Sequence, residues 1–139
     1  MQEREEIMKN YVYPAVFTAE SGGLYSVNFP DLKNCYTCGD DLADALEMAK
    51  DVLSLTLYEY QKNKVDFPEP SDLKSIQCDN DSFVNFVSAN TLAYQKKFNN
   101  KAVKKTLSIP EWLNEAASAA NINFSQVLQE GLLHALDLT

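Results

Sequence analysis

The first part of the chain alternates apolar and polar positions in short runs that predict β-strands. Residues 11–20, "YVYPAVFTAE", are rich in aromatic and β-branched side chains, which favour strands. The glycine pair in "SGG" (21–23) predicts a turn, and residues 24–29, "LYSVNF", alternate again. These runs predict a hairpin. Because Pro14 has no backbone N–H to donate, we expect the first strand to lie at a sheet edge or to carry a bulge there.

The pattern then changes to helical spacing. Residues 40–63, "DDLADALEMAKDVLSLTLYEYQKN", repeat apolar positions three and four apart, which predicts a long amphipathic helix. Asp40 or Asp41 is placed to cap its first turn. The face that we expect to pack against a sheet comprises Leu42, Ala45, Leu46, Ala49, Leu53, Leu57 and Tyr60.

Two further short strands complete the predicted first domain. "CYTC" (35–38) lies before the long helix, and "SFVNFVSA" (82–89) follows a proline-containing connector, "VDFPEPSDL" (65–73). Residues 90–102 predict a short helix that leads into a linker. The order β-β-β-α-β predicts an α+β domain with one long helix on a small sheet.

The last forty residues predict a strand followed by two helices. Alternate positions divide residues 103–109 into two faces. One face holds Val103, Lys105, Leu107 and Ile109, and the other holds Lys104, Thr106 and Ser108. Pro110 suits the first turn of the helix that follows. The spacing of Ser108 and Glu111 predicts a capping box that would occupy the Ser108 hydroxyl.

The two C-terminal helices each have an apolar face. We expect Leu113, Ala116, Ala117 and Ala120 to line the first helix. Asn123 and Gln126 are spaced to cap the second helix, which places Phe124, Val127, Leu128, Leu132, Ala135 and Leu136 on one side.

This C-terminal segment is too small to fold alone. Residues 103–137 comprise 35 residues, and chains below about 40 residues rarely bury enough apolar surface to offset their ordering entropy. A lone strand also leaves its ladder groups unpaired. Both problems are solved if two copies pair their strands and share one core, so we predict a homodimer through residues 103–137. The sequence leaves higher oligomers open.

Charge is distributed unevenly along the chain. The net charge is −8, but residues 1–95 carry 7 basic and 16 acidic side chains (−9), and residues 96–139 carry 5 and 4 (+1). Lys96, Lys97, Lys101, Lys104 and Lys105 fall within ten residues. This asymmetry favours two parts with different partners. We expect a cytoplasmic protein, because "MQEREEIMKN" is not a secretory signal and no apolar run is long enough to span a membrane.

The residues that could carry catalysis are few. Cys35 and Cys38 form a C-x-x-C, but with only Cys78 and His134 elsewhere a zinc site of about four ligands is not assembled. We interpret the two cysteines as small strand residues. Three acids, Asp31, Asp40 and Asp41, lie near one another in sequence, and we interpret them as turn and cap residues. We therefore predict no enzyme, no cofactor and no metal.

The C-terminal stretch "VKKTLSIPEWLNEAASAANINFSQVLQEGL" resembles the ribbon-helix-helix DNA-binding module at the C-terminus of HicB-family antitoxins. The N-terminal stretches "YPAVFTAESGGLYSVNFPDL", "TCGDDLADALEMAKDVL" and "FPEPSDL" are similar to the same family. The resemblance covers nearly all of residues 11–137. The glycine that often precedes the cysteine in the family is Asn34 here.

This resemblance implies a fold, a function and sites. It implies a partial RNase H-like fold without catalytic acids, and a HicA-like mRNA-cleaving toxin as partner. In the family the paired strands enter the major groove of operator DNA, and a two-stranded ribbon reads base edges there. The base-reading positions are then Lys104, Thr106 and Ser108. Phosphate contacts fall on Asn123, Phe124 and Ser125, at a helix N-terminus, and on Lys105. Candidate toxin contacts are Tyr25, Asp31 and Tyr36.

The resulting hypothesis is an antitoxin with three segments. Residues 1–95 bind the toxin, residues 96–102 form a linker, and residues 103–139 dimerise and repress the operon. A helix-turn-helix reader is less favoured because "NFSQVLQEGLLHAL" has no Lys or Arg. Two alternatives stay open: a divergent metal-dependent nuclease that uses Asp31, Asp40 and Asp41, and an oligomeric interaction module without a DNA target.

Overall fold

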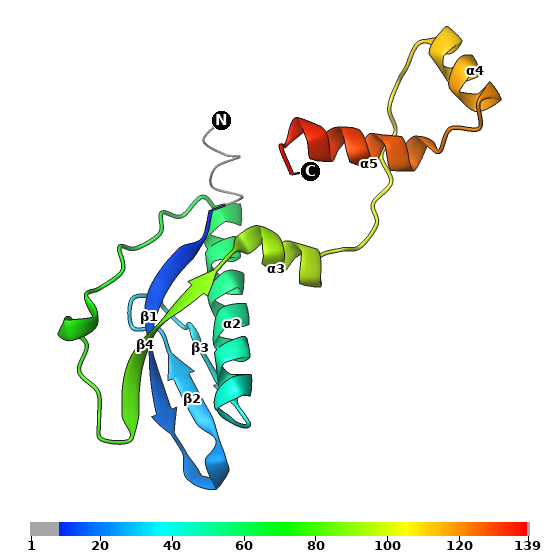
Figure 1. Cartoon of the computed structure of the whole chain (residues 1–139). Helices are drawn as coiled ribbons and strands as arrows, with labels where there is room; N and C mark the ends of the chain where they lie inside the picture. The colour runs from blue at the N-terminus through cyan, green and yellow to red at the C-terminus, as the bar shows by residue number, and fades with distance from the viewer. Residues whose placement is uncertain (1–8, 139) are drawn as a thin grey trace. The chain divides into compact units, whose positions relative to one another are not determined.

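The computed structural model describes residues 9–138 and divides the chain into two compact units. Unit 1 comprises residues 1–100 and unit 2 comprises residues 101–139. The order of elements in unit 1 is β1 (Tyr11–Ala19), η1 (Ser21–Gly23), β2 (Tyr25–Asn28), β3 (Tyr36–Gly39), α2 (Leu42–Lys62), η2 (Leu73–Ser75), β4 (Ser82–Ala89) and α3 (Thr91–Phe98). Unit 2 holds α4 (Glu111–Ala119) and α5 (Phe124–Ala135). Figure 1 shows these elements along the chain.

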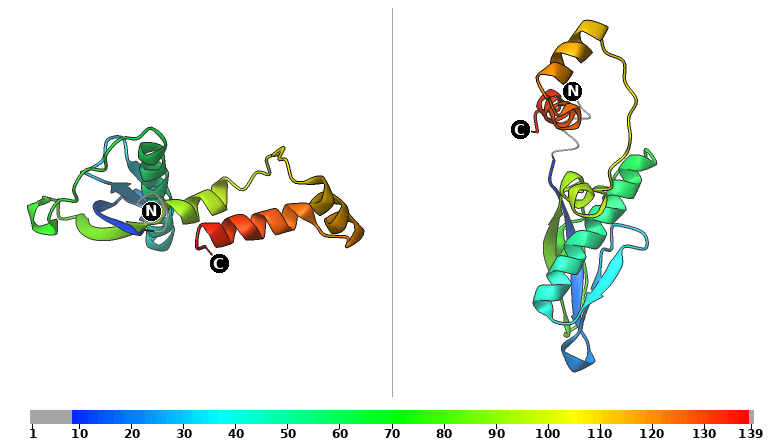
Figure 2. Two further views of the ribbon diagram at one scale, coloured as in Figure 1. Left: turned by 90° about the horizontal axis from the view of Figure 1, so that it is seen from above. Right: turned by 90° about the vertical axis from the view of Figure 1, so that its right-hand side faces the viewer.

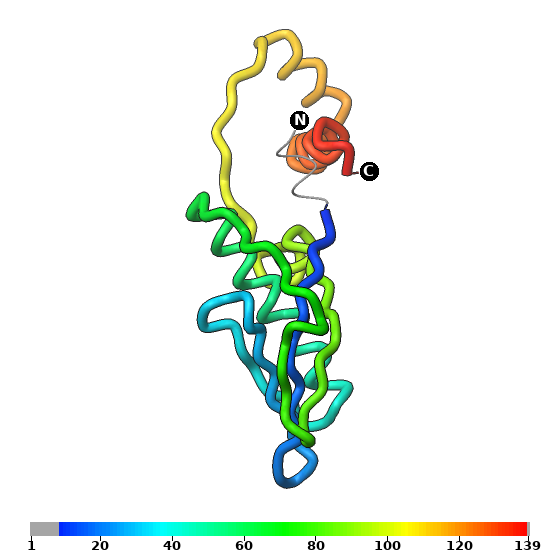
Figure 3. The backbone as a smooth tube through the Cα atoms, turned by 90° about the vertical axis from the view of Figure 1, so that its left-hand side faces the viewer, coloured from blue at the N-terminus to red at the C-terminus, as the bar shows by residue number. Residues whose placement is uncertain are grey.

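Unit 1 is an α+β fold built on a four-stranded antiparallel sheet. The strand order is β3-β2-β1-β4, and α2 packs on one face (Figure 1). The connector between α2 and β4 begins on the α2 side, where Phe67 packs against the core. Its later part runs over the opposite face, in front of β1 and β2 in Figure 3 and away from α2 in Figure 2. The predicted β-β-β-α-β order and the predicted hairpin are thus confirmed.

The position of β1 corrects one prediction. β1 pairs with β2 on one side and with β4 on the other, so it is an interior strand. Its register with β4 passes Pro14 without a break, so Pro14 marks neither the sheet edge nor the bulge that we expected. The pairing with β2 begins only at Val16. On the β2 side, Pro14 therefore lies beyond the end of the ladder, where a missing N–H leaves no neighbour unpaired.

The core lies between α2 and the sheet. Buried α2 side chains of one i, i+4 row, Ala45, Ala49, Leu53 and Leu57, meet buried strand side chains that include Ala15, Phe17 and Val27. Leu42 and Leu46 were expected in this face but are exposed. Leu46 directly follows Ala45 in the sequence and lies about 100° around the helix from the buried row, and Leu42, four residues before Leu46, lies on the same side as Leu46.

The start of α2 shows why the chain turns where it does. The carboxylate of Asp41 accepts a hydrogen bond from the backbone N–H of Asp44 at 2.8 Å and caps the helix, as predicted. Gly39 ends β3 against this first turn, and a Cβ there would lie 2.2 Å from the backbone nitrogen of Ala45. Asn34, in the loop before β3, takes a φ of 54°, a left-handed conformation that asparagine tolerates.

The connector is anchored to α2 through the rings of Tyr60 and Phe67, whose centroids are 6.2 Å apart, and to the sheet through β1. The ring of Phe67 contacts Tyr11 edge-on with 4.8 Å between centroids, and the Tyr13 hydroxyl donates to the Pro68 carbonyl at 2.5 Å. Farther along, the Asp31 carboxylate accepts hydrogen bonds from the backbone N–H of Ser71 at 2.9 Å and from the Ser71 hydroxyl. A segment without regular secondary structure is thereby held across the sheet.

α3 begins at a capped asparagine and packs on α2. The Asn90 side chain accepts a hydrogen bond from the Ala93 N–H at 3.0 Å. Lys97 lies 3.4 Å from the Asp51 carboxylate of α2. Because α3 extends to Phe98, it includes the first three residues of the segment 96–102 that we expected to be a linker. Among residues 9–138, no helix has both the length and the hydropathy needed to cross a bilayer.

The Tyr13 hydroxyl predicts a pH dependence of stability. Burial, with smaller effects of the Glu69 and Asp31 carboxylates, raises the pKa of Tyr13 from 10.0 to about 12. The folded chain therefore holds this proton more tightly than the unfolded chain does. The stabilisation is complete below pH 10 and is lost as the pH rises from 10 to 12.

Urea unfolding at a series of pH values measures this effect. Tyr13→Phe should lower the free energy of unfolding by about 1 kcal/mol at neutral pH, because the Pro68 carbonyl loses its donor. The variant should also lose less stability than the parent between pH 10 and 12. An equal loss in both proteins would show that Tyr13 does not cause the dependence.

Candidate functional site

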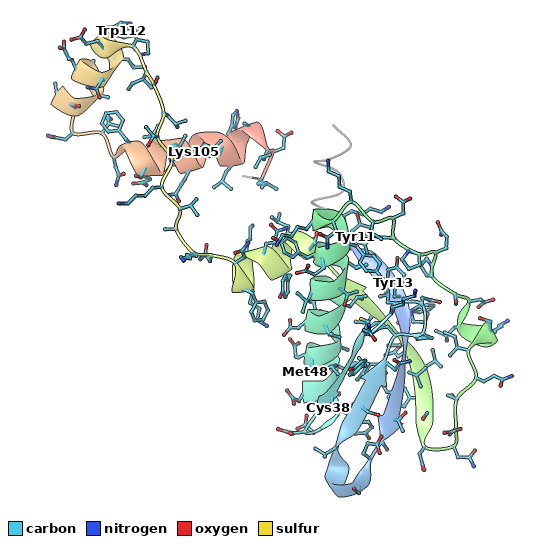
Figure 4. All side chains as sticks on the ribbon, turned by 180° about the vertical axis from the view of Figure 1, so that it is seen from behind. Tyr11, Tyr13, Cys38, Met48, Lys105 and Trp112 are labelled. Carbon is cyan, nitrogen blue, oxygen red and sulfur yellow. The ribbon has the colours of Figure 1, made fainter. Side chains whose placement is uncertain are left out.

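The segment that carries the predicted base-reading residues has no regular secondary structure in the single chain. No strand is assigned between residues 99 and 110. Lys104, Thr106 and Ser108 are exposed, and Lys105 lies on the same extended stretch (Figure 4). The four-stranded sheet of unit 1 does not include this segment. Its backbone groups are therefore available for pairing with another chain.

The two helices of unit 2 expose their apolar faces. Leu132 is 54% exposed, and Val127, Leu113 and Phe124 are each 40% exposed or more. No residue between 101 and 138 is buried. Apolar side chains at helical spacing are typical of a packed face, and here the face has no partner within the described part of unit 2.

Sequence reasoning omitted some members of this apolar surface. Trp112 is 69% exposed near the start of α4 (Figure 4), and Ile122 and Leu133 are also exposed. The residue type alone was a usable signal, because tryptophan is highly buried on average in folded proteins. Trp112 was passed over because it falls outside the stripe of Leu113, Ala116 and Ala117.

The N-terminus of α5 has the predicted cap. The Asn123 side chain accepts a hydrogen bond from the Gln126 N–H at 3.1 Å. Phe124 and Ser125 form the first turn and are exposed. Helix N-termini present backbone N–H groups that lack intrahelical partners, together with the positive end of the helix dipole. This geometry can accept an anion.

The cap that was predicted at Ser108 does not form. α4 begins at Glu111 with Pro110 as its N-cap residue, and no side chain caps it. A Ser108–Glu111 capping box would make Ser108 the N-cap residue, and the observed N-cap lies two residues later. The Ser108 hydroxyl is therefore not occupied by this helix.

The three candidate toxin contacts do not form one surface. Tyr25 shares the α2 side of the sheet with buried Val27 and is half-buried. Tyr36 pairs with Asn28 on the other side and is 66% exposed. Asp31 is held by Ser71. Of the three, Tyr36 is the one whose side chain is open to a partner.

The acidic residues that could serve a nuclease are used locally. Asp31 anchors the connector and Asp41 caps α2. The backbone N–H of Asp40 donates to the Asp44 carboxylate at 2.9 Å. In the part of the chain that the structure describes, no three His, Cys, Asp or Glu side chains form a metal-binding group.

The C-x-x-C cysteines differ in environment. Cys35 is buried, and its sulfur accepts a hydrogen bond from the Thr56 hydroxyl at 3.3 Å. Burial raises the pKa of the Cys35 thiol, and the Thr56 hydrogen bond lowers it by less. Cys38 is exposed on β3 (Figure 4). Cys38 is thus a strand residue as predicted, whereas Cys35 lies just before β3.

Comparison with known proteins shows the family. Residues 13–131 match the sequence profile described as "HicB_like antitoxin of bacterial toxin-antitoxin system". Antitoxin HicB 1 of Photorhabdus laumondii is 39% identical over 67 residues, or 46% of this chain and 43% of that protein. Antitoxin HicB of Escherichia coli K12 is 36% identical over 63 residues, or 45% and 46%. The matched segments thus span less than half of these relatives.

A solved structure agrees with the fold over most of the chain. A chain in the toxin–antitoxin complex from Streptococcus pneumoniae is 27% identical with a TM-score of 0.59, and the match covers 91% of this chain and 99% of that one. The α+β architecture and the predicted family are therefore confirmed. The family is one of antitoxins, which are not enzymes, and this overturns the nuclease alternative. The chain belongs to the HicB-like antitoxins of bacterial toxin–antitoxin systems.

Proposed function

We propose that this chain neutralises a HicA-like mRNA-cleaving toxin through unit 1 and represses its own operon through a dimer of unit 2. The observation that carries the second part is the apolar surface of unit 2, of which no residue between 101 and 138 is buried. The first part is supported by family membership and by the charge of −9 over residues 1–95. On this proposal, unit 1 is a partial RNase H-like fold.

Unit 2 suits a ribbon-helix-helix dimer. Two copies of residues 103–109 would pair antiparallel, and four helices would close over one core. The free energy for this comes from burial at roughly 25 cal/mol per Å² of apolar surface. Val103, Leu107 and Ile109 are exposed and would face the shared core. Lys104, Thr106 and Ser108 would then face outward.

The outward side of the ribbon fits the major groove of DNA. A two-stranded ribbon fits that groove, lysine donates to guanine acceptors, and serine and threonine bond to several bases. Because the first helix does not use the Ser108 hydroxyl, all three side chains are candidates for base reading. The first turn of α5 and Lys105 would hold phosphates on either side.

The toxin contact is driven by charge and by an exposed aromatic side chain. A protein that cleaves mRNA is cationic where it binds RNA, and an acidic surface steers such a partner during encounter. The complex that contains the S. pneumoniae relative is a toxin–antitoxin complex, which supports a toxin as partner of this chain. Tyr36 is the best placed of the three candidates, because exposed aromatic residues dominate many interfaces.

Replacing the central ribbon residues tests the repressor function. Lys104→Ala combined with Thr106→Ala should weaken binding to the promoter DNA of the chain's own operon at least 30-fold, because each lost base contact costs about 1–3 kcal/mol. Gel-shift titration at fixed salt measures the affinity. Lys74→Ala, an exposed lysine in η2, is the matched control. Dimerisation should persist in both variants, and unchanged DNA affinity of the double variant would refute the ribbon assignment.

Replacing Tyr36 tests the toxin contact. Tyr36→Ala should weaken binding of the small basic protein encoded next to this chain by about 5- to 50-fold, as loss of a central interface aromatic does. Calorimetric titration with a catalytically inactive toxin measures the change. Phe98→Ala removes a comparably exposed aromatic ring at the end of α3 and should have little effect. Equal affinities of the Tyr36 variant and the parent would place the contact elsewhere.

A further inference from the structure

β4 presents an open edge of the sheet. It is the last strand in the order β3-β2-β1-β4, and within residues 9–138 only β1 pairs with it. Natural proteins protect such edges with charged residues, proline or short strands. β3, at the other edge, is four residues long. β4 is eight residues long, and its sequence, SFVNFVSA, contains no charged residue, no proline and no glycine.

The hydrogen bonds show which backbone groups of β4 point to this edge. In an antiparallel strand, the N–H and C=O of one residue point to the same side, and successive residues alternate. The Ala19 N–H donates to Asp81 on the β4 side at 2.9 Å, whereas the Glu20 N–H donates to Leu24 on the β2 side at 2.8 Å. The odd-numbered residues of β1 therefore bond to β4.

The register of the β1–β4 pair shows which residues of β4 bond to β1. Phe17 lies opposite Phe83 and Ala15 lies opposite Asn85, so odd-numbered β4 residues bond to β1. The groups of Val84, Phe86 and Ser88 then point to the open edge. The Phe86 N–H confirms the direction, since its acceptor is the side-chain oxygen of neighbouring Asn85 at 3.0 Å and not β1.

The sequence of β4 allows two antiparallel copies of the strand to pair with favourable side chains opposite one another. Residues 82–88 read S-F-V-N-F-V-S. In an antiparallel pair of two copies centred on Asn85, serine meets serine, each phenylalanine meets a valine, and asparagine meets asparagine. Aromatic and β-branched residues directly opposite one another are favourable cross-strand pairs. An antiparallel pair centred on Val84 or Phe86 would align fewer residues and would no longer place each phenylalanine opposite a valine.

The two phenylalanine side chains of these pairs are exposed, whereas Val84 is half-buried and Val87 is 6% exposed. Phe86 is 53% exposed, and Phe83 is 39% exposed although its ring stacks on Phe17 with 5.2 Å between centroids. The Phe83 ring would meet Val87 of the other copy on the α2 side of the sheet, and the Phe86 ring would meet Val84 of the other copy on the connector side. Pairing would therefore extend the apolar surface on both faces.

We propose that β4 is a second self-association surface, which pairs antiparallel with β4 of another copy about a two-fold axis at Asn85. The Phe86 N–H would exchange its Asn85 acceptor for the Val84 carbonyl of the other copy. Two four-stranded sheets would become one sheet of eight strands, with no charge at the junction of two units that each carry −9 over residues 1–95. A cationic partner would gain no ion pair at this strand, which favours a second copy as occupant.

This surface is independent of the proposed dimer of unit 2. The two contacts involve different residues, and each can be lost without the other. A chain with two self-association surfaces can close both within one pair of copies, or join two pairs into a larger assembly. In either case the unit 1 domains of two copies are held together by their sheets and not only through their C-terminal units.

Disulfide trapping in the full-length chain tests the register. Opposed residues of a non-hydrogen-bonded antiparallel pair have Cα atoms about 4.5 Å apart, within the range that a disulfide spans. In a Cys38→Ser, Cys78→Ser background, Asn85→Cys should form disulfide-linked dimers at least 10-fold faster than Asn28→Cys under the same mild oxidation. Asn28 is exposed on β2, so it controls for copies brought together by unit 2 alone. Equal rates for the two variants, or no dimer of the Asn85→Cys variant, would overturn the proposal. If β4 binds a strand of a different protein, the Asn85→Cys dimer will not form, and the proposal is wrong in that case too.

A matched pair of charge variants gives a second measurement. Asn85→Asp keeps an acceptor for the Phe86 N–H but places two carboxylates opposite each other at the axis. Like charges directly opposite destabilise a strand pair. Sedimentation velocity should show at least 10-fold weaker association of the Asn85→Asp chain than of Asn28→Asp, which adds the same charge on β2. Indistinguishable association of the two variants would contradict the two-fold at Asn85.

Discussion

An extended segment and two short helices bury too little apolar surface to fold alone, and the proposed dimer of unit 2 depends on this constraint. Between residues 101 and 138 no side chain is buried, although α4 and α5 carry well-formed apolar faces. Unit 1, in contrast, has its own core between α2 and the sheet. On the proposed dimer, folding of the C-terminal unit is linked to association. On the proposed function, the DNA-reading surface would be lost whenever the two copies separate.

The sequence predicted the elements of unit 1 well but not their neighbours in the sheet. Alternation and helical spacing are local signals, so they located β1, β2, β4 and α2. Strand order depends on pairing between distant residues, and the edge or bulge that Pro14 led us to expect is absent from β1. The contact of Asp31 with Ser71, forty positions away, is likewise not visible in local spacing. Periodicity also placed Leu42 and Leu46 on the buried face, and both are exposed.

The candidate sites were predictable to different degrees. The Asn123 cap follows from a spacing of three residues and is present. Ser108 and Glu111 have the same spacing, but the predicted capping box does not form, because α4 begins at Glu111 with Pro110 as its N-cap residue. The assignment of base-reading side chains rests on which ribbon face is polar, which alternation alone can predict. The toxin surface could not be predicted, since Tyr25 and Tyr36 look equivalent in sequence but lie on opposite faces of the sheet.

Amide hydrogen exchange at a series of protein concentrations tests the central claim most directly. Amides in the core of unit 1 should be protected at every concentration, because that core is complete within one chain. Amides of α4 and α5 should be protected at high concentration and should lose protection together as dilution separates the copies. Protection of α4 and α5 that persists in a chain shown to be monomeric would contradict the account.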